Sequence, residues 1–205
     1  MSENIFDFQD GIGPVAAHRH VNGGGWVADT TKVTGNAWVT GNARVSGNAK
    51  VTGNAVVSGN AWVTGNAVVS GNAKVTGNAW VSGNAWVFDN AVVFDNAVVT
   101  GNARVYGNAR VYGNALVSGN AVVFDNAVVF DNSVVTRNPV FISNIYHNIT
   151  ITDKHIQIGC QCFLTEELYQ LTENELQKLS SHYKEWQETK EFVIGLARFH
   201  QKDIK

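Results

Sequence analysis

The chain has 205 residues, a formal net charge of −2 and an isoelectric point near 6.3. A domain that binds nucleic acid or an anionic membrane surface would show a clustered basic excess, so neither is an expected partner. The only cysteines, Cys160 and Cys162, are too close together for a disulfide framework. The first residues lack a basic segment followed by an apolar run, and no stretch approaches the roughly 18 apolar residues of a membrane span. We therefore expect no signal peptide and a reducing, cytoplasmic setting.

Residues 1–25 show no period, and Gly11, Pro14 and glycines 23–25 mark turns in them. The first unit of a stacked array exposes a core that a different segment has to cover. We interpret residues 1–25 as an irregular N-terminal cap.

Residues 26–140 repeat a six-residue unit, strictly from Val33 onward, in the form Val-Thr-Gly-Asn-Ala-Trp with variations. The Val and the Ala two places before it alternate with outward positions, as in a strand of about four residues. Gly-Asn or Asp-Asn then turns the chain, and the order Gly-Asn argues against hairpins, which favour Asn-Gly. If three units make one triangular turn, stacking gives about six coils and a prism about 30 Å tall.

Stacking of this kind would bury only Val and Ala, with Ser133 as a small polar exception. One asparagine per coil would form a ladder along one corner, in which each side-chain amide pairs with those above and below it. The ladder would consist of Asn36, Asn54, Asn72, Asn90, Asn108 and Asn126.

The unit, an aliphatic residue with a small residue two places earlier, resembles the hexapeptide repeat of left-handed parallel β-helix proteins. Two further segments, NGGGWVADTTKV and ITITDKHIQIGC, resemble hexapeptide-repeat proteins of phages and prophages that are described as acyltransferases or polymer-forming proteins. This resemblance implies a mainly β fold, a left-handed coil and a homotrimer.

One outward face of the predicted coil is flat and mostly apolar, with only Ser or Thr beside its side chains. Six coils of such a face exceed the few hundred Å² of apolar patch that a monomer normally exposes. We predict a subunit interface there, with cover by the C-terminal segment as the alternative. The face carries Trp26, Arg44, Trp62, Trp80, Val98, Leu116 and Val134.

The other two faces carry aromatic columns in their C-terminal halves. These are Phe88, Tyr106 and Phe124 on one face and Phe94, Tyr112 and Phe130 on the other. Stacking of the rings on one another is the main interpretation. Alternatively, the columns form a shelf for a planar or phosphate-bearing ligand with Arg104 and Arg110, because Arg matches phosphate oxygens and ring faces accept stacking.

An acyltransferase would need a histidine base, and the repeats contain neither a histidine nor an inserted loop. The candidates left are His18 and His20 before the repeats and His147 and His155 after them. Two histidines alone are a poor metal site, and we expect no metal and no cofactor.

Residues 141–205 lose the period. They predict an irregular exit, a hairpin from residues 149–152 and 155–158, a short helix opened by the capping box Thr172–Glu175, and a longer helix capped by Ser181. An apolar stripe on that helix is predicted to pack on the prism. It consists of Tyr183, Trp186, Lys190, Val193 and Ala197.

The leading hypothesis is a non-enzymatic trimeric scaffold of phage or prophage origin that binds a host protein. The alternatives are a protein that sequesters a small nucleotide signal and an acyl-CoA-dependent acyltransferase.

Overall fold

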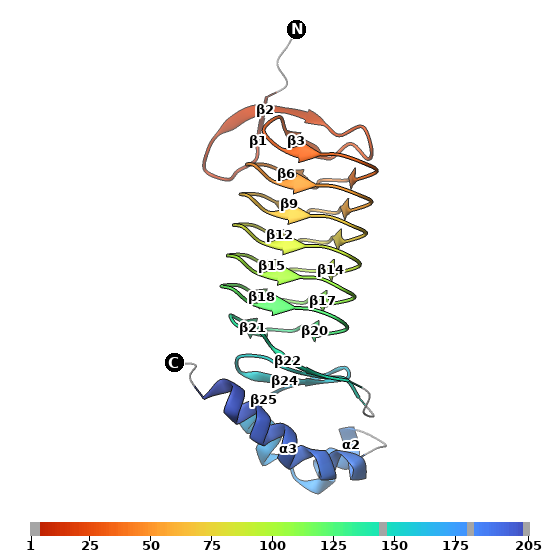
Figure 1. The fold of residues 1–205 in the computed structure, drawn as a ribbon, viewed down its shortest axis with the longest axis vertical. Coiled ribbons are helices and arrows are strands. Elements are labelled where there is room, and N and C mark those ends of the chain that lie inside the picture. Colours follow the sequence, from red (N-terminus) through yellow and green to blue (C-terminus); the bar gives the residue numbers. More distant parts are fainter. Residues whose placement is uncertain (1–4, 144–146, 180–182, 203–205) are drawn as a thin grey trace.

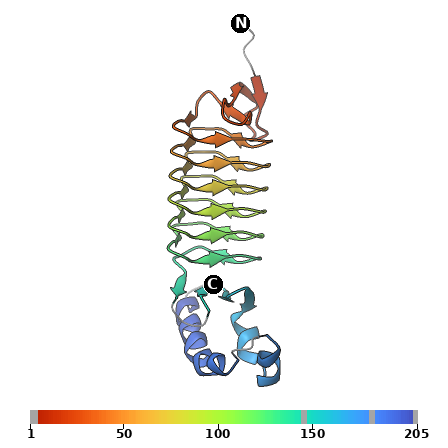
Figure 2. The ribbon, with the colours of Figure 1, turned by 90° about the vertical axis from the view of Figure 1, so that its right-hand side faces the viewer.

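The computed structural model describes residues 5–143, 147–179 and 183–202, except for the side chains of residues 176, 179 and 183–189. These residues form a tall, three-sided parallel β-solenoid with a different cap at each end (Figures 1 and 2). The repeat fold predicted from the six-residue period is thereby confirmed. None of the described helices is long and apolar enough to cross a membrane.

Three sheets make the sides of the solenoid. Sheet I consists of β1 (Ile5–Asp7), β2 (Pro14–Arg19), β3 (Trp26–Ala28), β6 (Arg44–Val45), β9 (Trp62–Val63), β12 (Trp80–Val81), β15 (Val98–Val99), β18 (Leu116–Val117) and β21 (Val134–Val135). Sheet II consists of β4 (Lys32–Val33), β7 (Lys50–Val51), β10 (Val68–Val69), β13 (Trp86–Val87), β16 (Arg104–Val105) and β19 (Val122–Val123). Sheet III consists of β5 (Trp38–Val39), β8 (Val56–Val57), β11 (Lys74–Val75), β14 (Val92–Val93), β17 (Arg110–Val111) and β20 (Val128–Val129).

Each coil pairs in parallel with the coil 18 residues further on, as in the pair Trp62 and Trp80. Most regular strands are two residues long, shorter than the predicted four, but backbone bonding continues into the corners. The amide of Thr64 donates to Val81 O at 3.0 Å and that of Asn66 to Gly83 O at 2.8 Å. The backbone therefore remains paired around the coil.

The corners depend on a left-handed backbone and on asparagine. Gly65 has φ +68°, and an added Cβ would lie 2.9 Å from Gly83 O in the coil below. Asp89 takes the same conformation, at φ 59°, and it stands between glycines of the neighbouring coils. Asparagine ladders run along all three corners and not only along the predicted one, with Nδ2-to-Oδ1 distances of 3.0–3.3 Å.

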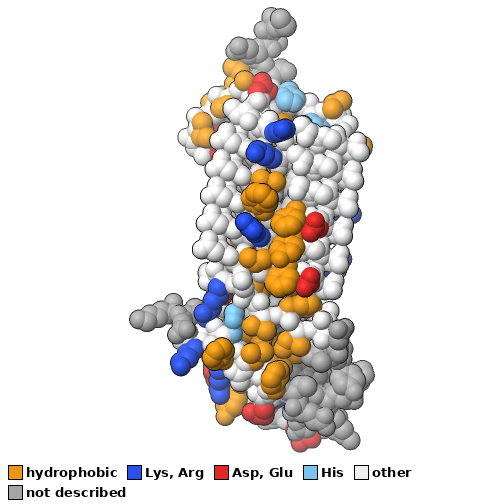
Figure 3. Space-filling view, in the orientation of Figure 1, with side chains coloured by type: hydrophobic (Ala, Val, Ile, Leu, Met, Phe, Trp, Pro, Cys, Tyr) orange, Lys and Arg blue, Asp and Glu red, His pale blue; other side chains and the backbone are white. Residues whose placement is uncertain are grey.

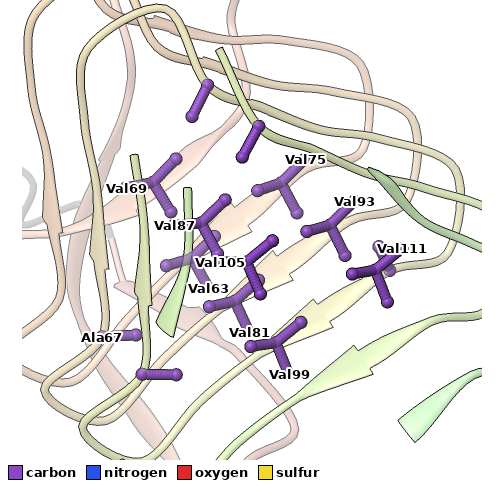
Figure 4. Packing of buried hydrophobic residues seen from close by; sticks show 14 of the residues in the cluster. Val63, Ala67, Val69, Val75, Val81, Val87, Val93, Val99, Val105 and Val111 are labelled. Atoms are coloured by element: carbon purple, nitrogen blue, oxygen red, sulfur yellow. The ribbon is translucent and has the colours of Figure 1, made fainter. Parts of the chain in front are cut away.

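The interior of the solenoid is Val and Ala, nearly all of it completely buried (Figure 4). Each buried Val contributes about 1.5–2 kcal/mol of transfer free energy. Ser133, the predicted polar exception, is completely buried and accepts a hydrogen bond from Gln157 Nε2 at 2.9 Å. That bond links the last coil to the C-terminal cap.

The N-terminal cap is more regular than the glycine-rich sequence predicts. Strand β1 pairs antiparallel with β2, and β2 pairs antiparallel with β3, so the cap extends sheet I beyond the first coil. Phe8 is completely buried in a small cluster with Ala17 and Ala28. A different sheet geometry thus ends the parallel stack.

The C-terminal cap is a four-stranded antiparallel sheet, sheet IV. It contains the predicted hairpin of β23 (Ile149–Ile151) and β24 (His155–Ile158), flanked by β22 (Val140–Ile142) and β25 (Gln161–Leu164). The expected irregular exit is wrong for β22, because this segment pairs antiparallel with β23. Parallel stacking therefore ends at β21, and Val140 lies in sheet IV.

Helices α1 (Thr165–Gln170), α2 (Glu173–Leu179) and α3 (Tyr183–Gln201) complete this cap. Helix α2 begins where the capping box predicts, and Thr172 N and Oγ1 donate to Glu175 Oε2 at 2.9 and 2.7 Å. These bonds lower the pKa of Glu175. Val193 and Ala197 pack on sheet IV and not on the prism, because sheet IV lies between α3 and the last coil. Ser181 and the side chains of Tyr183 and Trp186 lie outside the described residues.

Candidate functional surfaces

The aromatic column of sheet II is a stack of rings. The centroids of Phe88 and Tyr106 are 4.8 Å apart with 12° between the planes, and those of Tyr106 and Phe124 are 5.7 Å apart. Arg104 lies 5.8 Å from the centroid of Trp86. Figure 3 shows a column of hydrophobic side chains along the lower half of the solenoid, with basic side chains on one flank and acidic ones on the other.

The column of sheet III is built in the same way. Phe94 and Tyr112 stack at 4.7 Å, and Tyr112 and Phe130 at 5.3 Å. Phe130 is 4% exposed, and burial raises the pKa of the Tyr112 phenol, with a further contribution from Asp131.

Self-stacking of both columns is therefore confirmed, and it limits what a ligand can reach. Rings stacked along the coil axis present their edges to solvent, since their faces contact one another. Arg104 and Arg110 are exposed beside these edges. A flat ligand near them would meet edges and guanidinium groups, and not an open ring face within the column.

The lower part of sheet I is the uncharged side of the solenoid. We call the outward side chains of β12, β15, β18 and β21 the apolar face; they are Trp80, Val98, Leu116 and Val134. Ser or Thr follows each buried Val beside them, at Ser82, Thr100, Ser118 and Thr136. At the equivalent outward positions, sheet II carries the charged side chains of Lys32, Lys50 and Arg104, and sheet III carries those of Lys74 and Arg110.

The upper part of sheet I, in contrast, is covered by the N-terminal segment of the same chain. Phe6 stacks on Trp26 at 4.2 Å, and Arg44 Nη1 donates to Phe8 O at 3.2 Å. The C-terminal elements, which the sequence offered as the alternative cover, continue beyond the last coil (Figures 1 and 2).

The candidate histidines lie at opposite ends of the solenoid. His18 Nδ1 is 2.7 Å from Asp29 Oδ1, and both side chains are more than half exposed. His20 contacts the backbone of Asn22. His147 and His155 belong to the C-terminal cap, where burial lowers the pKa of His155. No group of three potential metal ligands occurs within the described part of the chain.

A buried polar group joins the last coil to sheet IV. Asp153 is 4% exposed, and its Oδ2 accepts from Thr136 N and Oγ1 at 2.9 and 2.6 Å. Nearby, Arg137 donates to the backbone oxygen of His200. Burial lowers the pKa of His200, and the positive charge of Arg137 lowers it further.

The sequence did not reveal a cleft of about 470 Å³ between the N-terminal cap and the first coils of sheet I. It is lined by Phe6, Arg19, Trp26, Asn42, Arg44, Asn60 and Trp62. One feature of the sequence could have indicated this site: Arg44 stands among Trp26, Trp62 and Trp80 in the same outward column. The contributions of Phe6 and Arg19 depend on β1 and β2, whose pairing the repeat does not predict.

Comparison with known families matches parts of the chain to a family described as YdcK beta solenoid repeat. The matches span residues 43–59, 57–71, 103–119 and 109–123, which together cover 50 of the 205 residues. No curated protein matches the chain. Together with the coil geometry, the repeat match shows that the chain is a β-solenoid repeat protein.

Proposed function

We propose that the chain is a non-enzymatic scaffold that assembles as a homotrimer through the apolar face. The observation that carries this proposal is the absence of charge along this one side: from β12 to β21, sheet I presents no outward charged side chain. Water-exposed apolar patches of this length are typical of interfaces. Three copies packed around an axis parallel to the solenoids would bury all three faces.

The partner on this face is a second copy of the chain. Around a three-fold axis the apolar face of each copy would turn toward that axis, and contacts between the copies would recur at every coil because all copies have the same coil spacing. The resemblance to trimeric hexapeptide-repeat proteins supports the same arrangement.

In such a trimer the two aromatic columns would remain on the outside. We propose that they and the C-terminal helices bind a host protein, in a module of phage or prophage origin that works in the bacterial cytoplasm. The same two sheets also carry the exposed side chains of Trp38 and Trp86, and exposed aromatic side chains are typical anchors for protein partners. We prefer this function to acyl transfer, because all six histidines lie outside the coils.

The assembly can be tested by sedimentation velocity at micromolar concentration. Val98 and Val92 occupy equivalent outward, half-buried positions in the same coil, Val98 on sheet I and Val92 on sheet III. We expect Val98→Lys to yield monomers, because the interface would bury an unpaired charge, and the matched Val92→Lys to stay trimeric. Far-UV circular dichroism checks that both variants fold. A monomeric wild type, or a trimeric Val98→Lys, would contradict the proposal.

A further inference from the structure

One wall of the N-terminal cleft is a column of aromatic and arginine side chains, which we call the N-terminal stack. Neighbouring strands of sheet I bring its members into register: Arg19 pairs with Trp26, Trp26 with Arg44, Arg44 with Trp62, and Trp62 with Trp80. Phe6 of β1 joins the stack against Trp26.

Distances within the N-terminal stack show that each guanidinium lies over aromatic rings. The Arg19 guanidinium carbon is 4.4 Å from the centroid of Trp26. That of Arg44 lies 5.6 Å from the centroid of Phe6 and 6.0 Å from that of Trp62. A guanidinium that lies over a ring keeps its N–H donors for hydrogen bonds to other groups.

Only part of this hydrogen-bonding capacity is used by the protein. Arg19 Nη1 donates to Gly24 O at 2.8 Å, and Arg44 Nη1 donates to Phe8 O and Gln9 Oε1. Among the described residues, no carboxylate forms an ion pair with either guanidinium. Each Arg has five N–H donors, so both can still receive an anion.

The spacing of the two charges restricts the ligand. Arg19 and Arg44 are two strands apart, which corresponds to about 10 Å along the solenoid axis. A single small anion cannot engage both forks. Trp26 lies between them, and because Phe6 and Arg19 already lie against its ring, it offers no free face on which a nucleobase could stack.

The side of the cleft next to the corner is formed by amides. Asn42 Nδ2 donates to Asn60 Oδ1 at 3.1 Å, and Asn42 is the first member of its ladder. Within the described part of the chain no donor reaches Asn42 Oδ1, which is therefore available for a hydroxyl group. An amide oxygen and two separated cations suit a chain of hydroxylated rings that carries acidic groups at intervals.

We propose that the N-terminal cleft binds a linear acidic saccharide, with the carboxylates of alternate sugars on Arg19 and Arg44 and a hydroxyl group of the intervening sugar on Asn42. Bidentate contact with carboxylate is the interaction to which the guanidinium fork is best suited. The site is complete within one chain, so this inference does not rest on the proposed trimer.

The test is isothermal titration calorimetry of the 205-residue chain with trigalacturonate, with neutral maltotriose and inorganic sulfate as controls. We expect saturable binding of trigalacturonate that weakens with salt, and none of maltotriose. Arg19→Gln and Arg44→Gln should each weaken binding by roughly tenfold or more. The matched control is Arg104→Gln, which removes a guanidinium over Trp86 outside the cleft, and should leave the affinity unchanged.

Because Arg44 also holds the cap through Phe8, circular dichroism has to show that Arg44→Gln folds. If Arg44→Gln does not fold, the test relies on Arg19→Gln and on Arg44→Lys. Lys keeps the positive charge but cannot form the bidentate contact with a carboxylate. The proposal is overturned if trigalacturonate does not bind, if Arg19→Gln binds it as tightly as the wild type, or if sulfate displaces it at equal concentration.

Discussion

The asparagine ladders allow a quantitative test of what holds the coils in register. Asn78 is an interior member: its Oδ1 accepts from Asn60 Nδ2 at 3.0 Å, and its Nδ2 donates to Asn96 Oδ1 at 3.0 Å. Asn36 begins another ladder and makes one such bond, to Asn54 at 3.3 Å. A typical hydrogen bond contributes a net ~0.5–1.5 kcal/mol, and these exposed side chains belong in the lower half of that range. We therefore expect Asn78→Ala to lower the free energy of unfolding by ~1–2 kcal/mol and Asn36→Ala by ~0.5–1 kcal/mol.

The assay is urea unfolding followed by both tryptophan fluorescence and circular dichroism. An Asn78→Asp variant adds a chemical check, because its carboxylate can still accept from Asn60 but cannot donate to Asn96. Near neutral pH, Asn78→Asp should lower the free energy of unfolding by less than Asn78→Ala does. If Asn78→Ala and Asn36→Ala cost the same, or if neither costs anything, the ladder is a by-product of stacking and not a source of register.

Two further predictions concern the corners and the C-terminal cap. Gly65→Ala should lower the free energy of unfolding by ~1–3 kcal/mol, because φ is positive and the new Cβ would lie 2.9 Å from Gly83 O. At Gly24 an added Cβ meets nothing within 4 Å, so Gly24→Ala should lower it only by the conformational ~1 kcal/mol. Equal losses for the two variants in urea unfolding would refute the close-approach argument. Burial lowers the pKa values of His155 and His200 below the ordinary 6.5, so the unfolded chain takes up protons first and stability should fall as the pH drops from about 7 to about 5. The double variant His155→Gln/His200→Gln should show a flatter pH dependence of the urea midpoint, and an unchanged slope would exclude these two groups as the cause.

The six-residue period was sufficient to predict the solenoid. Taking three units as one coil correctly predicted that Trp62 lies next to Trp80 and that the aromatic side chains stack in columns. The prediction works because every unit packs on a near copy of itself. The ladder that begins at Asn36 was also predicted. Its two companions follow from the same reasoning, since every unit carries an Asn at the same position.

Elements outside the repeat were harder to predict. Strands β22 and β25 were missed because Val-Phe-Ile and Gln-Cys-Phe-Leu lack the alternation that marks a half-buried strand. Helix α1 was missed because Leu164 occupies its N-cap position, where no polar side chain signals a start. The N-terminal stack was missed because the register of β2 on β3 is antiparallel and unrelated to the period.

The sequence by itself therefore determined the solenoid core, its corners and the uncharged side of sheet I. These features depend only on the packing of each unit on the equivalent unit of the next coil, and every unit of the repeat carries the residues for that packing. The tertiary structure alone decided how the ends are closed and where a cleft opens. Phe6 reaches Trp26, and Phe8 reaches Arg44, only because two non-repeating strands fold back over the first coils, and such contacts between distant, unlike segments have no counterpart in the repeat.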